Sequence, residues 1–520
     1  MKKTIALMTA CMVMAGTMTA CNPIKEAFND VNNKVSYLYT PPENAVSRDQ
    51  VTQGFKMEAA EEYGDCYMPP NTMPNYSVEE YNSITENRFL SAAEHPLSTF
   101  SVDVDTASYS NIRRMLKNGG KVNPDAVRIE EMINYFSYDY PEPTGDAPFS
   151  VNTELYDCPW NKESELLLVG LQTEEIDLSD RKPMNLVFLI DVSGSMMDEN
   201  KLPLVQKAFA MLSENLNKND RISIVTYAGA EEIVLQGAYG NEYAEITDCI
   251  YSLTAGGSTA GAAGISCAYE LAEEYFIEGG NNRVILATDG DLNVGPSSEE
   301  ELKELIEEKR KNGVNLSVLG FGTGNIKDDR MEALADNGNG NYAYIDSILE
   351  ARKVLVKEMG GTLFTVAKDV KIQTEFDPEY VESYRLIGYE NRVLSNEDFE
   401  NDQVDAGEIG AGHSVTALYE LVLTDEAEDD AKLLNVALRY KEPNGSKSKL
   451  LEYPVLAETL ETMPENLAFA AAVAEFGMLL RDSEYAGSAS YQQIRDLLDK
   501  TDMENEYRQE FSELVNIAFD

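Results

Sequence analysis

The stretch Asn185–Ile190 constrains the fold most strongly, because every residue after Asn185 is apolar and the run ends in a carboxylate, Asp191. An apolar run without alternation predicts a strand that is buried on both faces, and such strands belong to parallel sheets covered by helices. Ligands of these sheets bind at the carboxyl ends of the strands, where the strand order reverses. Asp191, Ser193 and Ser195 would lie at that edge, and three oxygen ligands on one tight loop suit a small divalent cation.

Two later stretches are candidates for the rest of such a site. Gly256-Gly257-Ser258-Thr259 forms a loop before a helical run at 262–276. Residues 284–288 form a second buried apolar strand, which is followed by Asp289 and Gly290. Because the carboxyl ends of parallel strands meet at one edge of a sheet, both stretches are expected close to Asp191.

These three stretches resemble the metal-ion-dependent adhesion site of the von Willebrand factor type A domain. That site is written Asp-x-Ser-x-Ser, then a Thr after a Gly pair, then Thr-Asp-Gly, and all three parts occur here in order. The resemblance implies a metal site whose cation is Mg²⁺, with Mn²⁺ or Ca²⁺ as alternatives, and whose ligands are Asp191, Ser193, Ser195, Thr259 and Asp289. Ser258 is the alternative hydroxyl, because the Ser-Thr doublet leaves the register open by one residue. The competing interpretation is that Asp191 and the two serines only satisfy backbone groups of a turn.

Between about Lys182 and Met359 the pattern alternates between strands and helices, which predicts a doubly wound, mostly parallel sheet. Strands are expected at 221–227, 314–321 and 341–345, and helices at 202–216, 242–253, 298–312, 327–336 and 346–358. The fold class is therefore α/β, with β-rich segments on both sides of this unit and a helical region at the C-terminus.

The segment before the α/β unit has its own signature. The run Phe100-Ser-Val-Asp-Val-Asp-Thr-Ala-Ser-Tyr109, followed by Arg113-Arg114, resembles the N-terminal segment of bacterial exported lipoproteins that carry a von Willebrand A domain. Asp103 and Asp105 lie on one side of a predicted strand that leads into a helix expected at 106–116, with Asp105 or Thr106 as its cap. Helix capping is the favoured role of the two carboxylates, and a second cation site is the alternative. A helix is expected at 125–136, with Asn123 as its cap and Pro124 in its first turn.

The chain is expected to divide into six parts: a lipoprotein signal peptide (1–20), a flexible tether (21–85), an N-terminal α+β segment (86–180), the von Willebrand A domain (181–360), a β-rich C-terminal domain (361–462) and C-terminal helices (463–520). The β-rich segments on both sides of the α/β unit are expected to pack together. Residues 22–85 are rich in Asn, Glu, Pro and Tyr and show no sustained apolar period, which is typical of a tether.

The N-terminus predicts export and membrane anchoring. Lys2 and Lys3 precede a largely apolar run of small residues that is too short for a comfortable membrane span, and Cys21 follows Ala20. This pattern resembles a bacterial lipoprotein signal, in which Cys21 becomes the lipidated N-terminus on the outer-membrane, periplasmic or surface side of the envelope. Four other cysteines lack the paired spacing of a zinc site, and the sequence does not pair them as disulfides: Cys66, Cys158, Cys249 and Cys267.

The net charge and the histidine content limit the classes of function that the chain can have. The net charge is −49, from 91 acidic and 42 basic residues, which excludes a sequence-independent nucleic-acid binder. We therefore expect a divalent-cation-dependent protein-binding module, in which a partner's Glu or Asp completes the metal shell, as the resemblance implies. A structural envelope lipoprotein with a non-functional site is the second alternative. A metal-assisted hydrolase is the third and is disfavoured, because the chain has only two histidines, His95 and His413, and both lie outside the α/β unit.

Overall fold

The computed structural model describes residues 81–102, 105–145, 147–175, 181–257, 261–290, 299–323, 328–357, 365–404, 406–443, 445–457 and 460–519. Several residues singled out from the sequence lie outside these ranges, so the predictions made for them stay predictions: Cys21, Cys66, Asp103, Ser258 and Thr259.

The α/β unit contains a six-stranded sheet in the order β10-β9-β8-β5-β6-β7. Its strands are β5 (Met184–Asp191), β6 (Arg221–Tyr227), β7 (Glu231–Tyr239), β8 (Asn281–Thr288), β9 (Val314–Phe321) and β10 (Tyr342–Ile345). All neighbouring pairs are parallel except β6 with β7, and β5 is buried along its whole length. The predicted α/β fold class is confirmed. The edge strand β7 was not predicted, because its first residues are exposed and polar and a glycine interrupts it at Gly237.

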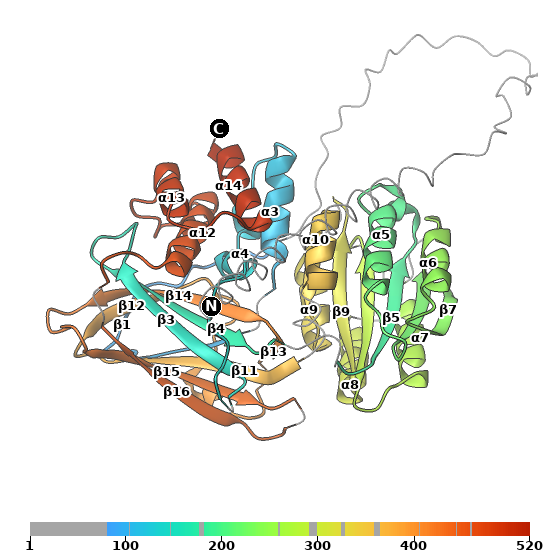
Figure 1. Ribbon diagram of the computed structural model, residues 1–520, viewed down its shortest axis with the longest axis horizontal. Helices are drawn as coiled ribbons and strands as arrows, with labels where there is room; N and C mark the ends of the chain where they lie inside the picture. Colours follow the sequence, from blue (N-terminus) through green and yellow to red (C-terminus); the bar gives the residue numbers. More distant parts are fainter. Residues whose placement is uncertain are drawn as a thin grey trace, which may run out of the picture. The chain divides into compact units, whose positions relative to one another are not determined.

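Helices cover both faces of this sheet (Figure 1). One face packs against α5 (Leu202–Ser213), α6 (Tyr243–Ser252) and α10 (Ile348–Arg352), and the other against α7 (Gly261–Glu274), α8 (Glu299–Lys311) and α9 (Asp328–Asn337). The single helix expected at 346–358 is instead the short α10, which continues as a π-helical turn at Lys353–Lys357.

Two antiparallel sheets are built by the segments on either side of the α/β unit. The first has the order β1-β12-β14-β4-β3, and the second the order β13-β11-β15-β16 with β2 also paired to β11. Their apolar faces enclose one shared core. Strands that precede the α/β unit thus pair with strands that follow it in both sheets. The bounds are β1 (Leu90–Ser91), β2 (Leu97–Ser101), β3 (Phe149–Asp157), β4 (Glu165–Thr173), β11 (Thr365–Phe376), β12 (Val381–Ile387), β13 (Gly407–Gly410), β14 (Ser414–Leu423), β15 (Lys432–Lys441) and β16 (Lys449–Leu456).

A helical layer joins the two ends of the described chain. It consists of α3 (Ala107–Lys117), α4 (Ile129–Asn134), α12 (Glu465–Arg481), α13 (Tyr491–Leu498) and α14 (Glu506–Phe519). The helix expected at 125–136 is divided into a 3-10 turn, Pro124–Ala126, and α4. Asn123 does cap the turn, through a hydrogen bond from the backbone N–H of Asp125. The interruption has a tertiary cause, because the carbonyl of Val127 accepts two hydrogen bonds from the guanidinium of Arg481.

Asp105 does not cap α3, which corrects the prediction for this residue. Thr106 occupies the N-cap position without a side-chain capping bond. The carboxylate of Asp105 instead accepts hydrogen bonds from the backbone N–H of Tyr342, at 3.1 Å, and from the Arg392 guanidinium, at 3.3 Å. Partners distant in sequence have therefore taken the oxygens that a local cap would use.

In the ranges described, no helix is both long and apolar enough to cross a membrane. Cys158 is a buried free thiol, and Cys249 and Cys267 are half-buried free thiols.

Candidate metal centre

Two carboxylates lie side by side at the carboxyl edge of the parallel sheet. Asp191 is the last residue of β5, and Asp289 follows the last residue of β8. Strands β5 and β8 are neighbours in parallel register, with Ile190 opposite Ala287. Both carboxylate residues are almost completely buried. The order of the sheet reverses at β5, since the next strand along the chain lies on one side of it and β8 lies on the other. This is the position at which open α/β sheets bind ligands.

The loop after β5 directs its hydroxyls to the same place. The backbone N–H of Ser193 donates to Asp191 Oδ1 at 2.8 Å, which turns the chain back over the end of the strand. The hydroxyls of Ser193 and Ser195 lie 2.9 Å apart. The alternation of Asp191, Ser193 and Ser195 therefore places three side-chain oxygen groups on one compact loop.

The glycine pair holds a second loop against the first. Gly256 N–H donates to the carbonyl of Val192 at 2.7 Å, and Gly194 N–H donates to the carbonyl of Gly257 at 3.1 Å. Gly257 has a φ of +86°, which side chains disfavour, and a Cβ on Gly194 would meet the Gly257 oxygen at 3.3 Å. The small residues thus allow the close approach. The chain that leaves this loop carries Ser258 and Thr259, which lie outside the described residues.

The carboxyl group of Asp191 is buried in an environment that disfavours its charge. Burial, together with the nearby charge of Asp289, raises the pKa of Asp191 to about 6, and the hydrogen bonds from Ser193 oppose this shift. Asp191 Oδ2 and the Tyr227 hydroxyl are both buried, and within the described residues neither has a hydrogen bond of ordinary geometry. The two groups are nevertheless close enough for Tyr227 to stabilise the ionised carboxylate, which lowers the pKa of Asp191 slightly. Burial, followed by the charge of Asp191, raises the pKa of Tyr227 well above its ordinary value. A cation beside Asp191 Oδ2 would supply the missing interaction and favour the ionised carboxylate.

Lys201 contributes a cation to the site, and none of the sequence motifs includes this residue. Its ammonium lies 2.9 Å from Asp289 Oδ2, and both side chains are buried, with 6% and 0% exposed. Lys201 is the N-cap residue of α5. A positive charge at a helix N-terminus is disfavoured by the helix dipole, so the position of this lysine before an apolar helix was the available sequence signal.

The donor set fits a hard divalent cation. Asp191, Ser193, Ser195 and Asp289 offer carboxylate and hydroxyl oxygens, which are the ligands that Mg²⁺ takes together with water. Asp191 Oδ2, which is buried without a hydrogen bond of ordinary geometry, is the oxygen that such a cation would stabilise most. Within the described residues there is no cluster of three or more His, Cys, Asp or Glu side chains that could hold a metal. A cation at this edge would therefore depend on the hydroxyls.

Comparisons with known proteins agree with this architecture. Residues 185–357 match the family described as von Willebrand factor type A domain, and residues 75–168 match one described as von Willebrand factor. Residues 361–519 match the family described as uncharacterized protein YfbK, C-terminal. YfbK of Escherichia coli (strain K12) is 41% identical over 498 residues, which cover 91% of this chain and 86% of YfbK. The chain is thus a von Willebrand factor type A domain protein. It belongs to the YfbK family.

More distant similarities are confined to parts of the chain or to the fold. Inter-alpha-trypsin inhibitor heavy chain H3 of Homo sapiens is 31% identical over 176 residues, which cover 32% of this chain and 19% of that protein. A solved structure of a von Willebrand factor type A protein from Catenulispora acidiphila is 15% identical, with a TM-score of 0.43, and covers 71% of this chain and 89% of that chain.

Proposed function

We propose that the protein is a divalent-cation-dependent binding module that takes an acidic side chain of a partner protein as the last ligand of its metal. The observation that carries this proposal is the buried carboxylate of Asp191, whose Oδ2 has no hydrogen bond of ordinary geometry, beside the paired hydroxyls of Ser193 and Ser195. Asp289 would contribute an oxygen ligand from the end of β8. Thr259, or Ser258, would contribute a hydroxyl from the loop after the glycine pair.

The composition of the ligand set supports binding rather than hydrolysis. Neutral hydroxyls replace some of the carboxylates that would otherwise cancel the charge of the cation, so the bound cation would keep an open, positively charged coordination position. A partner's Glu or Asp carboxylate suits that position. A hydrolase would need a general base beside the metal-bound water. The two carboxylates described at this edge, Asp191 and Asp289, are both assigned to the cation in this proposal, and neither His95 nor His413 belongs to the α/β unit, so among the described residues of this edge no further base stands beside the metal.

Thermal unfolding of the full-length protein tests the cation site. At about 100 times its dissociation constant, Mg²⁺ should add about 2.7 kcal/mol to the free energy of unfolding relative to protein in chelator. For an α/β unit of this size the expected rise in Tm is about 5–10 °C. Asp191→Ala and Ser193→Ala should abolish the rise, because each removes an oxygen group from the site.

The control variant is Asp198→Ala, which removes an exposed carboxylate close to the loop. It should keep the full response to Mg²⁺. If all four proteins respond alike, the cation binds the acidic surface and the proposal fails.

The proposal includes anchoring of the protein to the bacterial envelope through Cys21. The signal-like sequence of residues 1–20 supports this part of the proposal. The full chain expressed in a bacterium with an alkyne fatty acid should incorporate the label, and Cys21→Ser should abolish the incorporation. Cys11→Ser is the matched control, because Cys11 directly follows the same Met-Thr-Ala triplet that directly precedes Cys21. Labelling of Cys21→Ser at the level of the native protein would contradict the anchor.

A structural envelope protein with a non-functional metal site is the second candidate, and the Lys201–Asp289 ion pair favours it. An ammonium that neutralises Asp289 would let this edge of the sheet stay folded without a divalent cation. The two candidates differ in what happens when the ammonium is removed.

A further inference from the structure

A second polar site lies toward the opposite end of β8. Arg283 is the third residue of this strand, roughly 20 Å from Asp289 at the rise of an extended chain. Its side chain is 1% exposed and lines a cavity of about 260 Å³. Residues from β2, β11 and β13 complete the wall, so the cavity lies where the α/β unit meets the second antiparallel sheet.

The guanidinium of Arg283 forms no hydrogen bond to a carboxylate in the described part of the chain, although the charge of Glu408 acts on it. Its Nη1 donates to the Ser317 hydroxyl at 2.6 Å, and its Nε is buried without a partner. Burial lowers the pKa of Arg283 to about 10, so the group remains charged at neutral pH. A buried charge without a counterion is expensive, and proteins normally pair such a group or use it to hold a ligand.

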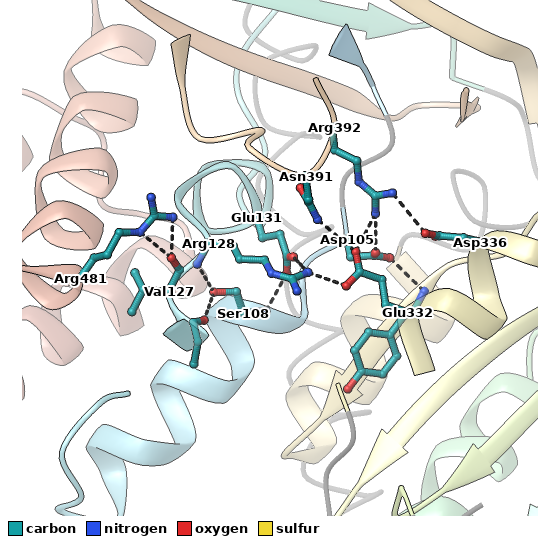
Figure 2. A network of polar contacts seen from close by, with 12 residues as sticks. Asp105, Ser108, Val127, Arg128, Glu131, Glu332, Asp336, Asn391, Arg392 and Arg481 are labelled. Atoms are coloured by element: carbon teal, nitrogen blue, oxygen red, sulfur yellow. Dashed lines mark hydrogen bonds and ion pairs between the residues drawn. The ribbon is translucent and has the colours of Figure 1, made fainter. Parts of the chain in front are cut away.

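The other charged groups of the cavity already have partners. The Arg392 guanidinium forms ion pairs with Asp105, Glu332 and Asp336, at 3.3, 3.0 and 3.2 Å (Figure 2).

Glu408 faces the same cavity but is held by neutral donors. It accepts hydrogen bonds from the Asn339 amide and the Thr365 hydroxyl, both at 2.8 Å. The charge of Glu408 acts on Arg283 and partly compensates it, but within the described residues no carboxylate forms a hydrogen bond or an ion pair with this guanidinium.

From this arrangement we infer that the cavity binds a small molecule carrying one carboxylate, with Arg283 as its anchor. A guanidinium binds a carboxylate through parallel hydrogen bonds, and the Nε of Arg283 is buried without a hydrogen-bond partner in the described residues. A single negative charge fits best, since Glu408 and Asp336 line the same cavity and would repel a dianion. The volume of about 260 Å³ lies just below the range of typical sites for drug-sized ligands, which favours a small ligand.

Acetate is the probe for a test on the full-length protein, with chelator present so that the metal centre does not contribute. Tm is followed while sodium acetate replaces sodium chloride at constant ionic strength. The native protein should show a saturable rise in Tm with acetate. Arg283→Met should weaken the apparent affinity by about tenfold to a hundredfold, the range expected for losing hydrogen bonds from a charged donor.

Two further variants make the result specific. Arg221→Met, at the amino end of β6, which is separated from β8 by β5, should keep the acetate response. If Arg283→Met does not fold, Ser317→Ala replaces it and should also weaken acetate binding, because the Ser317 hydroxyl orients the guanidinium.

Three results would overturn the inference: no saturable response of the native protein to acetate, an unchanged response in the folded Arg283→Met or Ser317→Ala variant, or an equal response to inorganic phosphate. The metal-binding proposal is unaffected by any of them, since it is tested with Mg²⁺ and the Asp191 and Ser193 variants.

Discussion

Lys201→Met should make the stability of the protein depend strongly on a divalent cation. In chelator, the variant loses the ammonium that faces the buried Asp289 carboxylate at 2.9 Å, and Asp191 lies close enough for its charge to add to the repulsion. Breaking a buried ion pair from one side costs about 3–5 kcal/mol, so Tm in chelator should fall by roughly 10 °C. The methionine keeps most of the apolar stem, which limits the loss of packing.

Mg²⁺ should then rescue the variant, with a larger rise in Tm than in the native protein. In the native protein a cation that approaches Asp289 meets the ammonium of Lys201 and is repelled by it. Removing that charge should tighten Mg²⁺ binding by about tenfold or more, measured by calorimetric titration. Lys207→Met, on an exposed position of α5, should change neither Tm nor affinity.

The same experiment separates the two candidate functions. If Mg²⁺ restores the stability of Lys201→Met, the oxygens at this edge form a working cation site and the ammonium acts as its internal competitor. If the variant is destabilised and Mg²⁺ does not restore it, Lys201–Asp289 is a structural ion pair. The envelope protein without metal binding would then be the better description.

The α/β sheet was predictable because its strands are buried on both faces. The apolar runs that became β5 and β8 carry their own signal, and strand β6 and strand β9 begin and end where they were expected. Strand β7 was missed because its pairing with β6 is set by tertiary contact on an edge, where half of its residues face solvent. The local sequence pattern therefore gives only a weak signal for such edge strands.

Contacts between residues that are distant in sequence could not be predicted from local sequence patterns. The structure brings the loop after Asp191 and the Gly256-Gly257 loop together, as expected from the meeting of parallel strand ends. The pairing of Lys201 with Asp289 joins residues 88 positions apart and has no periodic signal. The prediction that Asp105 caps a helix was wrong for the same reason, because Tyr342 and Arg392, which are distant in sequence, donate hydrogen bonds to its carboxylate.

The C-terminal helix α12 contains the second feature with a large expected effect. Glu475 is completely buried in apolar surroundings. Among the described residues, neither of its carboxyl oxygens accepts a hydrogen bond of ordinary geometry. Burial raises the pKa of Glu475 to about 8, and the backbone N–H of Ser490 opposes the shift only in part. The carboxyl group is therefore mostly protonated in the folded protein at neutral pH and mostly ionised in the unfolded chain.

The difference in protonation of Glu475 between the folded and unfolded states determines how stability changes with pH. The folded state binds more protons than the unfolded state between about pH 4.5 and pH 8, so the contribution of Glu475 to stability falls as pH rises through that window. At about 1.4 kcal/mol for each unit of pKa, the loss by pH 8 is roughly 3–5 kcal/mol. The loss is absent below the pKa of the unfolded chain, where both states hold the proton.

Glu475→Gln should remove this dependence, because the amide is similar in shape and does not ionise. Relative to the native protein, the variant should be nearly equal in stability at pH 4.5 and more stable by roughly 3 kcal/mol at pH 8, measured by urea unfolding across the range. Taking the difference between the two proteins cancels the titration of other groups, such as Asp191. Glu513→Gln, at an exposed position of α14, should show no such divergence with pH. A constant difference between Glu475→Gln and the native protein from pH 4.5 to pH 8 would mean that Glu475 ionises inside the fold as readily as in water, with a cation or water at its oxygens.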